Sequence, residues 1–241
     1  MSLTVANQMT VSLARLLKNG ETVFHGVASP LPMVAVLVAK RLQAPDLIYL
    51  NITGSVNPQP ERLPESTVDP ALLKGTAALF ELKDVFDLAA RGGLNTVFLS
   101  GLEIDRSGCI NMSAIGPYDK PKVRLPGGAG SAFLMETASR VIIWRTKHDR
   151  RTFVEKVAFT TACGTVDRVV TPLAVLRRGP DGLEVESIHS YSNPDEVRRE
   201  TGFPVKVSGE TAVTPPPTAE ELAALAAVDP EKVRLFEFRT S

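Results

Sequence analysis

Polar and glycine residues gather between Phe98 and Ser131, where an apolar run ends and no regular hydrophobic period follows. Carboxylate, guanidinium, amide and hydroxyl groups occur within this stretch: Glu103, Asp105, Arg106, Asn111 and Ser113. A structured loop of this length is uncommon in a compact domain and is usually functional. A β-hairpin turned at Arg106-Ser107-Gly108 and followed by a surface loop is the plainer interpretation, and it stays open. We favour a substrate site.

The end of this stretch is a glycine loop, Pro126–Ser131, that precedes a predicted short helix. Backbone N–H groups in such a loop suit an anion or an oxyanion, so we expect Gly127, Gly128, Ala129 and Gly130 to contact substrate. The loop has neither the phosphate-loop pattern nor the G-x-G-x-x-G pattern of dinucleotide-binding folds. The chain also has no G-x-S-x-G motif. These absences disfavour a nucleotide-dependent oxidoreductase and a self-contained hydrolase.

A second candidate stretch follows the apolar run Leu47–Leu50, which predicts a buried strand. Asn51, Thr53 and Gly54 come directly after it. Ligands of open α/β sheets bind beyond the carboxyl ends of the strands. We therefore expect these three residues to contact the substrate.

The elements that must position these residues alternate between strands and helices. A strand at Thr22–Val27, a helix at Leu31–Leu42 with Ser29 as its cap, and the strand Leu47–Leu50 form a βαβ unit, which implies a parallel sheet. Further segments are expected as a helix at Met9–Asn19, a helix at Glu81–Arg91 whose residues Leu82, Val85, Phe86 and Ala89 face inward, a strand at Thr96–Ser100, a helix at Ser131–Thr137 and a strand at Val141–Trp144.

The pattern changes after Val169. Strands at Val170–Leu176 and Leu183–His189 flank a Gly-Pro-Asp-Gly turn and predict an antiparallel hairpin. Asn193 caps a small helix, and a capping box at Thr218 opens a terminal helix that is either a packed terminus or a subunit contact. The predicted fold class is α/β, with an open, mostly parallel sheet flanked by helices, a C-terminal antiparallel hairpin and a terminal helix. We expect one domain over residues 1–241.

Composition excludes several classes of protein. The 27 basic and 27 acidic side chains balance, so we expect no nucleic-acid partner. No signal peptide and no apolar run of about 18 residues is present, which predicts a cytoplasmic protein without a membrane span. Cys109 and Cys163 make no disulfide framework and no metal motif. The isolated residues His25, His148 and His189 are expected to be structural.

Several ordered motifs together resemble the beta subunit of family I CoA-transferases, in the branch of glutaconate CoA-transferase. The resemblance runs from about Met9 to Val233. It rests on Ala44-Pro45-Asp46, on Gly101-x-x-Ile104-Asp105-x-x-Gly108-x-Ile110-Asn111-x-Ser113-x-Ile115-Gly116, on Pro121-Lys122-x-Arg124 with the glycine loop, on Asn193-Pro194-Asp195-Glu196-Val197, on Thr201-Gly202-Phe203 and on the ending from Thr218 to Pro230.

This resemblance implies a CoA-transferase-like α/β fold and an alpha subunit of the same family as partner. It also implies an active site at the interface between the two subunits. The substrates would be an acyl-CoA thioester and a carboxylic acid, and no cofactor would be bound permanently. In the family a glutamate carboxylate attacks the thioester and becomes a glutamyl-CoA thioester. That glutamate begins a Glu-Ser-Gly triplet, which here is Ile52-Thr53-Gly54.

The side chain of Ile52 cannot act as a nucleophile, and three interpretations follow. The alpha partner carries the carboxylate, as the resemblance to steroid-ring-opening CoA hydrolases implies. Alternatively, Glu103 replaces it, although a strand-end carboxylate paired with an arginine is the simpler role for that residue. The third interpretation is that the chain is a non-catalytic scaffold. The first is favoured, with CoA transfer between carboxylic acids as the expected reaction and thioester or ring-opening hydrolysis as the alternative.

Overall fold

The computed structural model describes residues 3–239 and divides the chain into two compact units. Unit 1 contains the residues up to Phe98 and those from Pro216 onward, and unit 2 is Leu99–Pro215. The expectation of one domain over residues 1–241 stays a prediction, and its ends, residues 1–2 and 240–241, lie outside the described residues. Each unit is described separately below.

The strands of unit 1 are ordered β5-β1-β2-β3-β4. β1 (Thr22–His25) pairs in parallel with β2 (Ile48–Asn51) and with β5 (Thr96–Leu99), which confirms the predicted βαβ unit. β3 (Ser55–Val56) and β4 (Ala78–Leu79) continue the sheet in antiparallel pairing. These two strands were not predicted, because two residues are too few to show a period.

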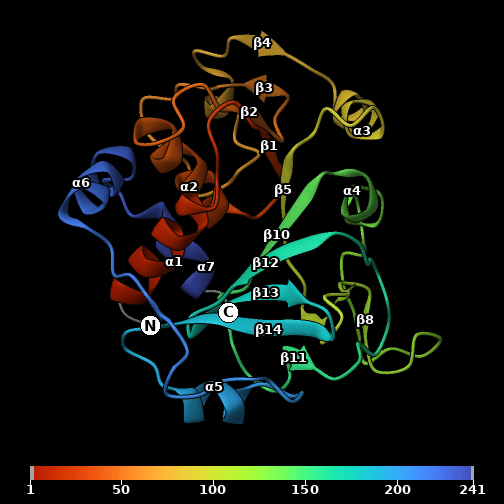
Figure 1. The fold of residues 1–241 in the computed structure, drawn as a ribbon. Coiled ribbons are helices and arrows are strands. Elements are labelled where there is room, and N and C mark those ends of the chain that lie inside the picture. Colours follow the sequence, from red (N-terminus) through yellow and green to blue (C-terminus); the bar gives the residue numbers. More distant parts are fainter. Residues whose placement is uncertain (1–2, 240–241) are drawn as a thin grey trace. The chain divides into compact units, whose positions relative to one another are not determined.

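The helices of unit 1 are α1 (Leu3–Arg15), α2 (Pro30–Arg41), α3 (Leu82–Ala90), α6 (Ala219–Val228) and α7 (Phe236–Arg239), with 3₁₀ turns η1 (Pro70–Leu73) and η2 (Val233–Leu235). α2 packs against α1, α6 and η2, and Figure 1 shows α1, α2 and α6 together on one side of β1 to β3 and α3 on the other. The capping box at Thr218 is confirmed. The terminal helix is therefore a packed element of unit 1.

Three expectations about unit 1 helices are wrong in detail. Ser29 precedes α2 but makes no side-chain cap, because its hydroxyl donates to the Gly26 carbonyl. Leu82 of α3 is 48% exposed rather than inward, although Val85 and Ala89 are buried. The first helix begins at Leu3 and ends at Arg15, so residues 16–19 are not helical. Helix boundaries are thus less predictable than helix existence.

The strands of unit 2 are ordered β15-β14-β13-β12-β10. β10 (Arg140–Trp144) and β12 (Val166–Val170) are parallel. β12, β13 (Ala174–Gly179) and β14 (Gly182–His189) are antiparallel, and β13 and β14 form a hairpin around the predicted Gly-Pro-Asp-Gly turn. The predicted first strand of this hairpin, Val170–Leu176, is wrong in its bounds, because residues 171–173 connect β12 to β13. A short strand, β15 (Val213–Thr214), pairs in parallel with β14. The predicted α/β fold class is confirmed.

Smaller elements of unit 2 carry the polar stretch. β6 (Glu103–Asp105) lies between β7 (Ile110–Asn111) and β11 (Phe153–Val154), and β8 (Ala114–Ile115) pairs with β9 (Val123–Arg124). β6 and β7 are the hairpin that the plainer interpretation expected, turned at Arg106-Ser107-Gly108. The short helices are α4 (Ser131–Thr137) and α5 (Pro194–Glu200), with Asn193 as the cap of α5.

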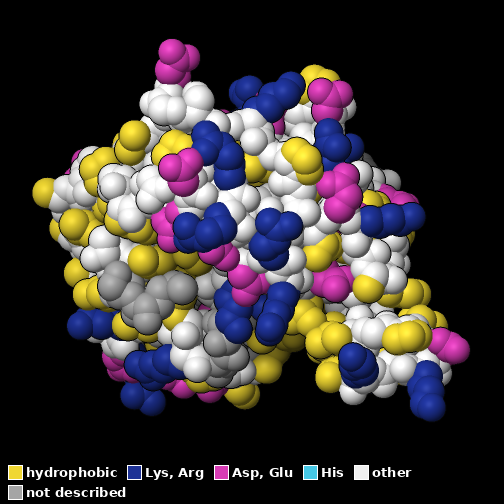
Figure 2. Space-filling model, turned by 90° about the horizontal axis from the view of Figure 1, so that it is seen from below, with side chains coloured by type: hydrophobic (Ala, Val, Ile, Leu, Met, Phe, Trp, Pro, Cys, Tyr) yellow, Lys and Arg dark blue, Asp and Glu magenta, His cyan; other side chains and the backbone are white. Residues whose placement is uncertain are grey.

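The described surface carries charges of both signs. Figure 2 shows basic and acidic side chains interspersed on the face in view, with no histidine among them. This agrees with the exposed fractions of the three histidines, which are 0%, 8% and 0% for His25, His148 and His189. Within residues 3–239, no helix combines the length and the apolar character needed to cross a membrane, and no group of three or more acidic, histidine or cysteine side chains could hold a metal ion.

Candidate active site in two loops

The first candidate loop is a tight turn at the end of β2. The Gly54 N–H donates to the Asn51 carbonyl at 2.9 Å, so Ile52 and Thr53 are the central residues of a four-residue turn. Gly54 has a φ of +92°, and a β-carbon there would lie 2.5 Å from the Phe80 carbonyl oxygen. Only glycine fits this position. Asn51, Thr53 and Gly54 therefore lie in one tight turn at the end of β2, and their contact with substrate stays a prediction.

The Asn51 side chain fixes the turn from inside. Its Oδ1 accepts hydrogen bonds from the Thr53 N–H at 2.9 Å and from the Thr53 hydroxyl at 2.7 Å. Thr53 Oγ1 lies 3.0 Å from Ser55 Oγ. Asn51 and Ser55 are fully buried, whereas Ile52 and Thr53 are half-buried. The side chain of residue 52 thus lies at the tip of a turn whose neighbours are held by hydrogen bonds.

Behind the turn lies a set of buried polar side chains that the sequence analysis did not connect with it. Tyr49 Oη accepts from Asn51 Nδ2 at 2.7 Å and lies 2.5 Å from His25 Nε2. Burial lowers the pKa of His25 to about 4 and raises the pKa of Tyr49 above its ordinary value. Both side chains are therefore neutral at pH 7. The available clue in the sequence was the occurrence of His25 and Asn51 at the ends of short, otherwise mostly apolar strands.

A small apolar cavity of about 210 Å³ adjoins the same strand, lined by Leu50, Val56, Phe80, Asp84, Val85, Leu88 and Arg91. Ligand pockets commonly measure about 300–1,000 Å³. This cavity is therefore too small for a whole CoA thioester and has room only for a short apolar group.

The second candidate loop is the glycine loop of unit 2. The Gly127 N–H donates to the Met112 carbonyl at 2.7 Å, so this group is not available to a ligand. Gly127 and Ala129 have φ of +85° and +42°, and Gly130 has φ of −79°. Within residues 3–239, no acceptor takes the N–H groups of Gly128, Ala129 or Gly130. Successive N–H groups in backbone of alternating handedness form a concavity that suits an anion.

Polar side chains hold this loop against the neighbouring segment. Thr161 Oγ1 accepts from the Met112 N–H at 2.8 Å and lies 2.7 Å from Ser113 Oγ. A β-carbon on Gly128 would approach the Thr161 methyl to 3.1 Å. The loop is thus closely packed on the side of Thr161. The N–H groups of Gly128, Ala129 and Gly130 are left without an acceptor in this arrangement.

Among residues 3–239, Glu103 has no arginine partner of the kind that its simpler role required. Its Oε2 accepts from Asn111 Nδ2 at 2.8 Å and from the Ala158 N–H at 2.9 Å. The expected ion pair with an arginine is therefore wrong, because the chain around Ala158 returns beside β6 and supplies a backbone donor instead. The carboxylate joins β6, β7 and this returning segment, which is a structural role.

A disulfide bond joins Cys109 to Cys163. The sequence analysis expected no disulfide framework and did not foresee this single bridge. The bridge spans 54 residues in sequence. An isolated antiparallel bridge between Ile110 and Ala162 brings the two segments together next to it. Local sequence gave no indication of this pairing, because it depends on how the distant segment returns.

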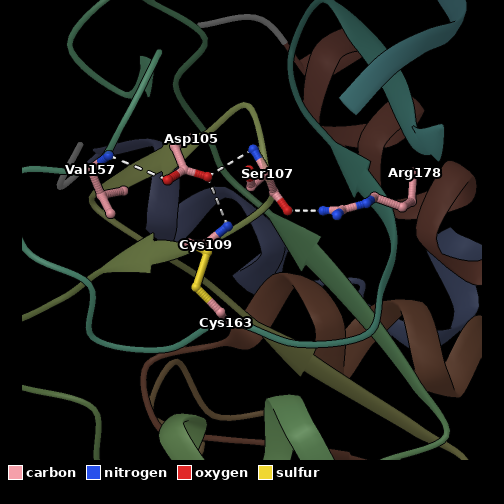
Figure 3. Close-up of a disulfide and its surroundings, with 6 residues drawn as sticks. All are labelled: Asp105, Ser107, Cys109, Val157, Cys163 and Arg178. Atoms are coloured by element: carbon pink, nitrogen blue, oxygen red, sulfur yellow. Dashed lines mark hydrogen bonds between the residues drawn. A yellow bond between two sulfur atoms is a disulfide. The ribbon is translucent and has the colours of Figure 1, made fainter. Parts of the chain in front are cut away.

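Asp105 organises the turn beside the disulfide, as Figure 3 shows. Its Oδ1 accepts from the N–H groups of Ser107 at 2.8 Å and Cys109 at 3.0 Å. The Val157 N–H donates to Oδ2 at 3.4 Å, and Arg178 donates to the Ser107 carbonyl. The polar stretch between Phe98 and Ser131 therefore contains both a scaffold, around Asp105 and Glu103, and the glycine loop.

A family model described as coenzyme A transferase matches residues 6–190. This match covers most of the chain, and the chain belongs to the coenzyme A transferase family. The fold and the two glycine-containing loops agree with the resemblance found in the sequence.

Two relatives and one solved structure illustrate the likeness. The chain is 32% identical to the B subunit of the 3-oxoadipate CoA-transferase of Pseudomonas knackmussii, over 92% of this chain and 91% of that protein. It is 26% identical to the B subunit of the glutaconate CoA-transferase of Acidaminococcus fermentans, over 90% and 89%. The crystal structure of the decarboxylase AibA/AibB superposes with a TM-score of 0.91 and 34% identity, covering 97% of this chain and 98% of that chain.

Proposed function

We propose that this chain is the beta subunit of a two-subunit enzyme that acts on acyl-CoA thioesters. Its partner is an alpha subunit of the same family, and the active site lies where the two subunits meet. Family membership and the similarity to the B subunits of two CoA-transferases support this assignment. Coenzyme A enters as part of the substrate and leaves with the product, so it is not a resident cofactor.

The mechanistic proposal rests on one observation: the Asn51–Gly54 turn is held by hydrogen bonds, but the side chain at its tip cannot act as a nucleophile. Asn51, Thr53 and Gly54 keep the hydrogen-bonded turn, but Ile52 stands where the resemblance implies a glutamate. The carboxylate is therefore supplied by the alpha partner. One of its oxygens attacks the thioester carbonyl, which expels CoA as a thiolate and leaves an anhydride. The thiolate then attacks the enzyme-side carbonyl of that anhydride, which gives an enzyme–CoA thioester and releases the acid.

The glycine loop would stabilise the oxyanion that forms on the thioester carbonyl. Three N–H groups without partners, at Gly128, Ala129 and Gly130, support this role. Fixed donors of this kind commonly contribute about 10²–10³ in rate for each hydrogen bond. In unit 1, Asn51, Thr53 and Gly54 remain the residues that we expect to bind substrate.

A second candidate is a reaction of the acyl-CoA that forms no enzyme thioester, namely hydrolysis or decarboxylation. Ile52 favours it, because this chain contributes no nucleophile at the turn. The 34% identity to a structure described as a decarboxylase supports it as well. Water activated by a general base, or loss of CO₂ from a suitably placed carboxylate, would then replace covalent catalysis.

Trapping separates these candidates. The chain is co-expressed with its alpha partner, and the complex is incubated with short monocarboxylic and dicarboxylic acyl-CoA thioesters and hydroxylamine. Mass mapping should then find a hydroxamate on the partner and none on this chain. Consumption of acyl-CoA without a hydroxamate on either subunit supports hydrolysis or decarboxylation, and a hydroxamate on Glu103 contradicts the assignment of the nucleophile to the partner.

A matched variant completes the experiment. Ile52→Glu places a carboxylate at the tip of the same turn, and a hydroxamate should then appear at position 52. A complex that consumes none of the thioesters in either form contradicts the enzymatic proposal and leaves the scaffold role.

A further inference from the structure

Five side chains form a continuous series of hydrogen bonds from the loop after β1 to the turn after β2. The series contains Ser29, His25, Tyr49, Asn51 and Thr53, with Ser55 attached at its end. Its members Ser29, His25, Tyr49, Asn51 and Ser55 are each 0% exposed. Burying so many polar groups is costly unless each one is paired, so a complete chain of this kind requires explanation.

The direction of every hydrogen bond follows from one carbonyl. His25 Nδ1 lies 3.1 Å from the Gly26 carbonyl oxygen, which can only accept, so Nδ1 carries the proton. Ser29 Oγ donates to the same carbonyl at 2.5 Å, and its own oxygen therefore accepts from His25 Nδ1 at 2.7 Å. Because His25 is neutral, its Nε2 has no proton and accepts from the Tyr49 hydroxyl.

The remaining bonds are then determined. Tyr49 has donated its only hydroxyl proton to His25, so its oxygen accepts from the Asn51 amide NH₂. This fixes Asn51 Oδ1 on the side of Thr53, where it accepts both the N–H and the hydroxyl of that residue. A flipped Asn51 amide would place its NH₂ against the Thr53 N–H, which can only donate. The histidine tautomer thus determines the orientation of the turn.

We propose that His25 and Tyr49 are positioning residues, which hold the Asn51–Gly54 turn in the one orientation that presents residue 52 and Thr53 to the acyl-CoA. This inference rests on the proposed function for the identity of the substrate. Neither residue contacts the reacting atoms. Their effect passes through Asn51, in the way that outer hydrogen-bond partners orient the groups that touch a substrate.

The tautomer of His25 tests the chain of hydrogen bonds independently of activity. Nitrogen-15 NMR of the full chain, labelled at its three histidines, distinguishes protonated from unprotonated ring nitrogens. His25 should carry its proton on Nδ1 at pH 7, with an unprotonated Nε2. An Nε2–H tautomer or a doubly protonated ring would overturn the proposal. Loss of the signal in His25→Gln assigns it.

Asn51→Asp reverses the chain in a predictable way. A carboxylate oxygen cannot donate to Tyr49, so the Tyr49 hydroxyl must turn and donate to residue 51. Its oxygen can then accept from a protonated His25 Nε2. Because Nδ1 keeps its proton against the Gly26 carbonyl, the ring takes a second proton from solvent and becomes an imidazolium, whose charge the new carboxylate balances. The Nε2 resonance should therefore shift from the unprotonated to the protonated range. An unchanged resonance in a folded Asn51→Asp protein would contradict the coupling.

Kinetics of the assembled complex test the positioning role. Tyr49→Phe keeps the ring but removes the hydroxyl, and it should lower kcat about 10-fold or more while KM changes little. The control is Thr10→Val, which removes an equally buried hydroxyl that donates to the Ala6 carbonyl at 2.7 Å in α1 of the same unit. This control should match the wild type. Equal kcat for Tyr49→Phe and wild type would overturn the role, whereas a wild-type complex without turnover would contradict the proposed function and leave the tautomer result standing.

Discussion

Single residues in the two loops are determined by backbone conformation as much as by chemistry. Gly54 is fixed by a carbonyl 2.5 Å from where its β-carbon would lie. Gly127 has open space around that point, so its requirement comes from a φ of +85° alone. At Gly54 there is no room for a β-carbon, whereas Gly127 is required because its backbone is left-handed. We therefore expect the two positions to differ in their tolerance to substitution.

Gly127→Val should reduce kcat/KM of the assembled complex about 100-fold, because strain at this residue displaces the three free N–H groups that follow it. The matched control is Gly92→Val. Gly92 has a φ of +75° and equally open space, but it ends α3. Both variants should lose roughly 1–2 kcal/mol of stability from the left-handed conformation, and only the first should lose activity. Equal activities of the two variants would show that the glycine loop is only a connection.

Elements that consist of long periodic segments were predictable, and the short ones that build the site were not. The helices α2, α4 and α6 and the hairpin of β13 and β14 agree with their patterns because burial and turn chemistry act locally. The pairing of β1 with β2 brings His25 within hydrogen-bonding distance of Tyr49, 24 positions away, and no local pattern encodes that register. The glycine positions were found since their backbone requirement is local, whereas the partners of Glu103 and Cys109 come from a returning segment.

The disulfide should stabilise the elements of unit 2 that it joins. Closing a loop of 54 residues removes conformational entropy from the unfolded chain, so we expect reduction to cost about 2–4 kcal/mol. Urea unfolding of the chain with and without a thiol reductant measures this difference. A double variant, Cys109→Ser with Cys163→Ser, should have the lower stability and show no response to the reductant. An unchanged midpoint for the native chain would mean that the two thiols are free in solution.

At the scale of the whole molecule, three buried histidines couple stability to pH. Burial lowers the pKa of His25 and His189 to about 4 and that of His148 to about 3. In the unfolded chain each has an ordinary pKa near 6.5. Between these values the unfolded state binds protons that the native state does not, so the stability is present above pH 6.5 and is lost as pH falls toward the folded pKa.

We therefore expect the free energy of unfolding to fall steeply between pH 6.5 and 4, by about 1 kcal/mol per pH unit for each histidine. Urea unfolding at pH 7, 6 and 5 measures the slope. His148→Gln should reduce it by about a third, because it leaves two of the three buried histidines. A stability that is the same at pH 7 and pH 5 would show that the histidines titrate normally in the native state.

In the turn after β2, the residues that fix the backbone differ from the residue whose side chain lies at the tip. Asn51, Thr53, Gly54 and Ser55 are constrained by hydrogen bonds or by the Phe80 carbonyl, whereas the side chain of Ile52 takes no part in holding the turn. A substitution at position 52 changes the side chain at the tip of the turn and leaves the backbone that presents it unaltered. We therefore expect that a substitution at position 52 alone can change the chemistry available at this turn without compensating mutations in the residues that hold it.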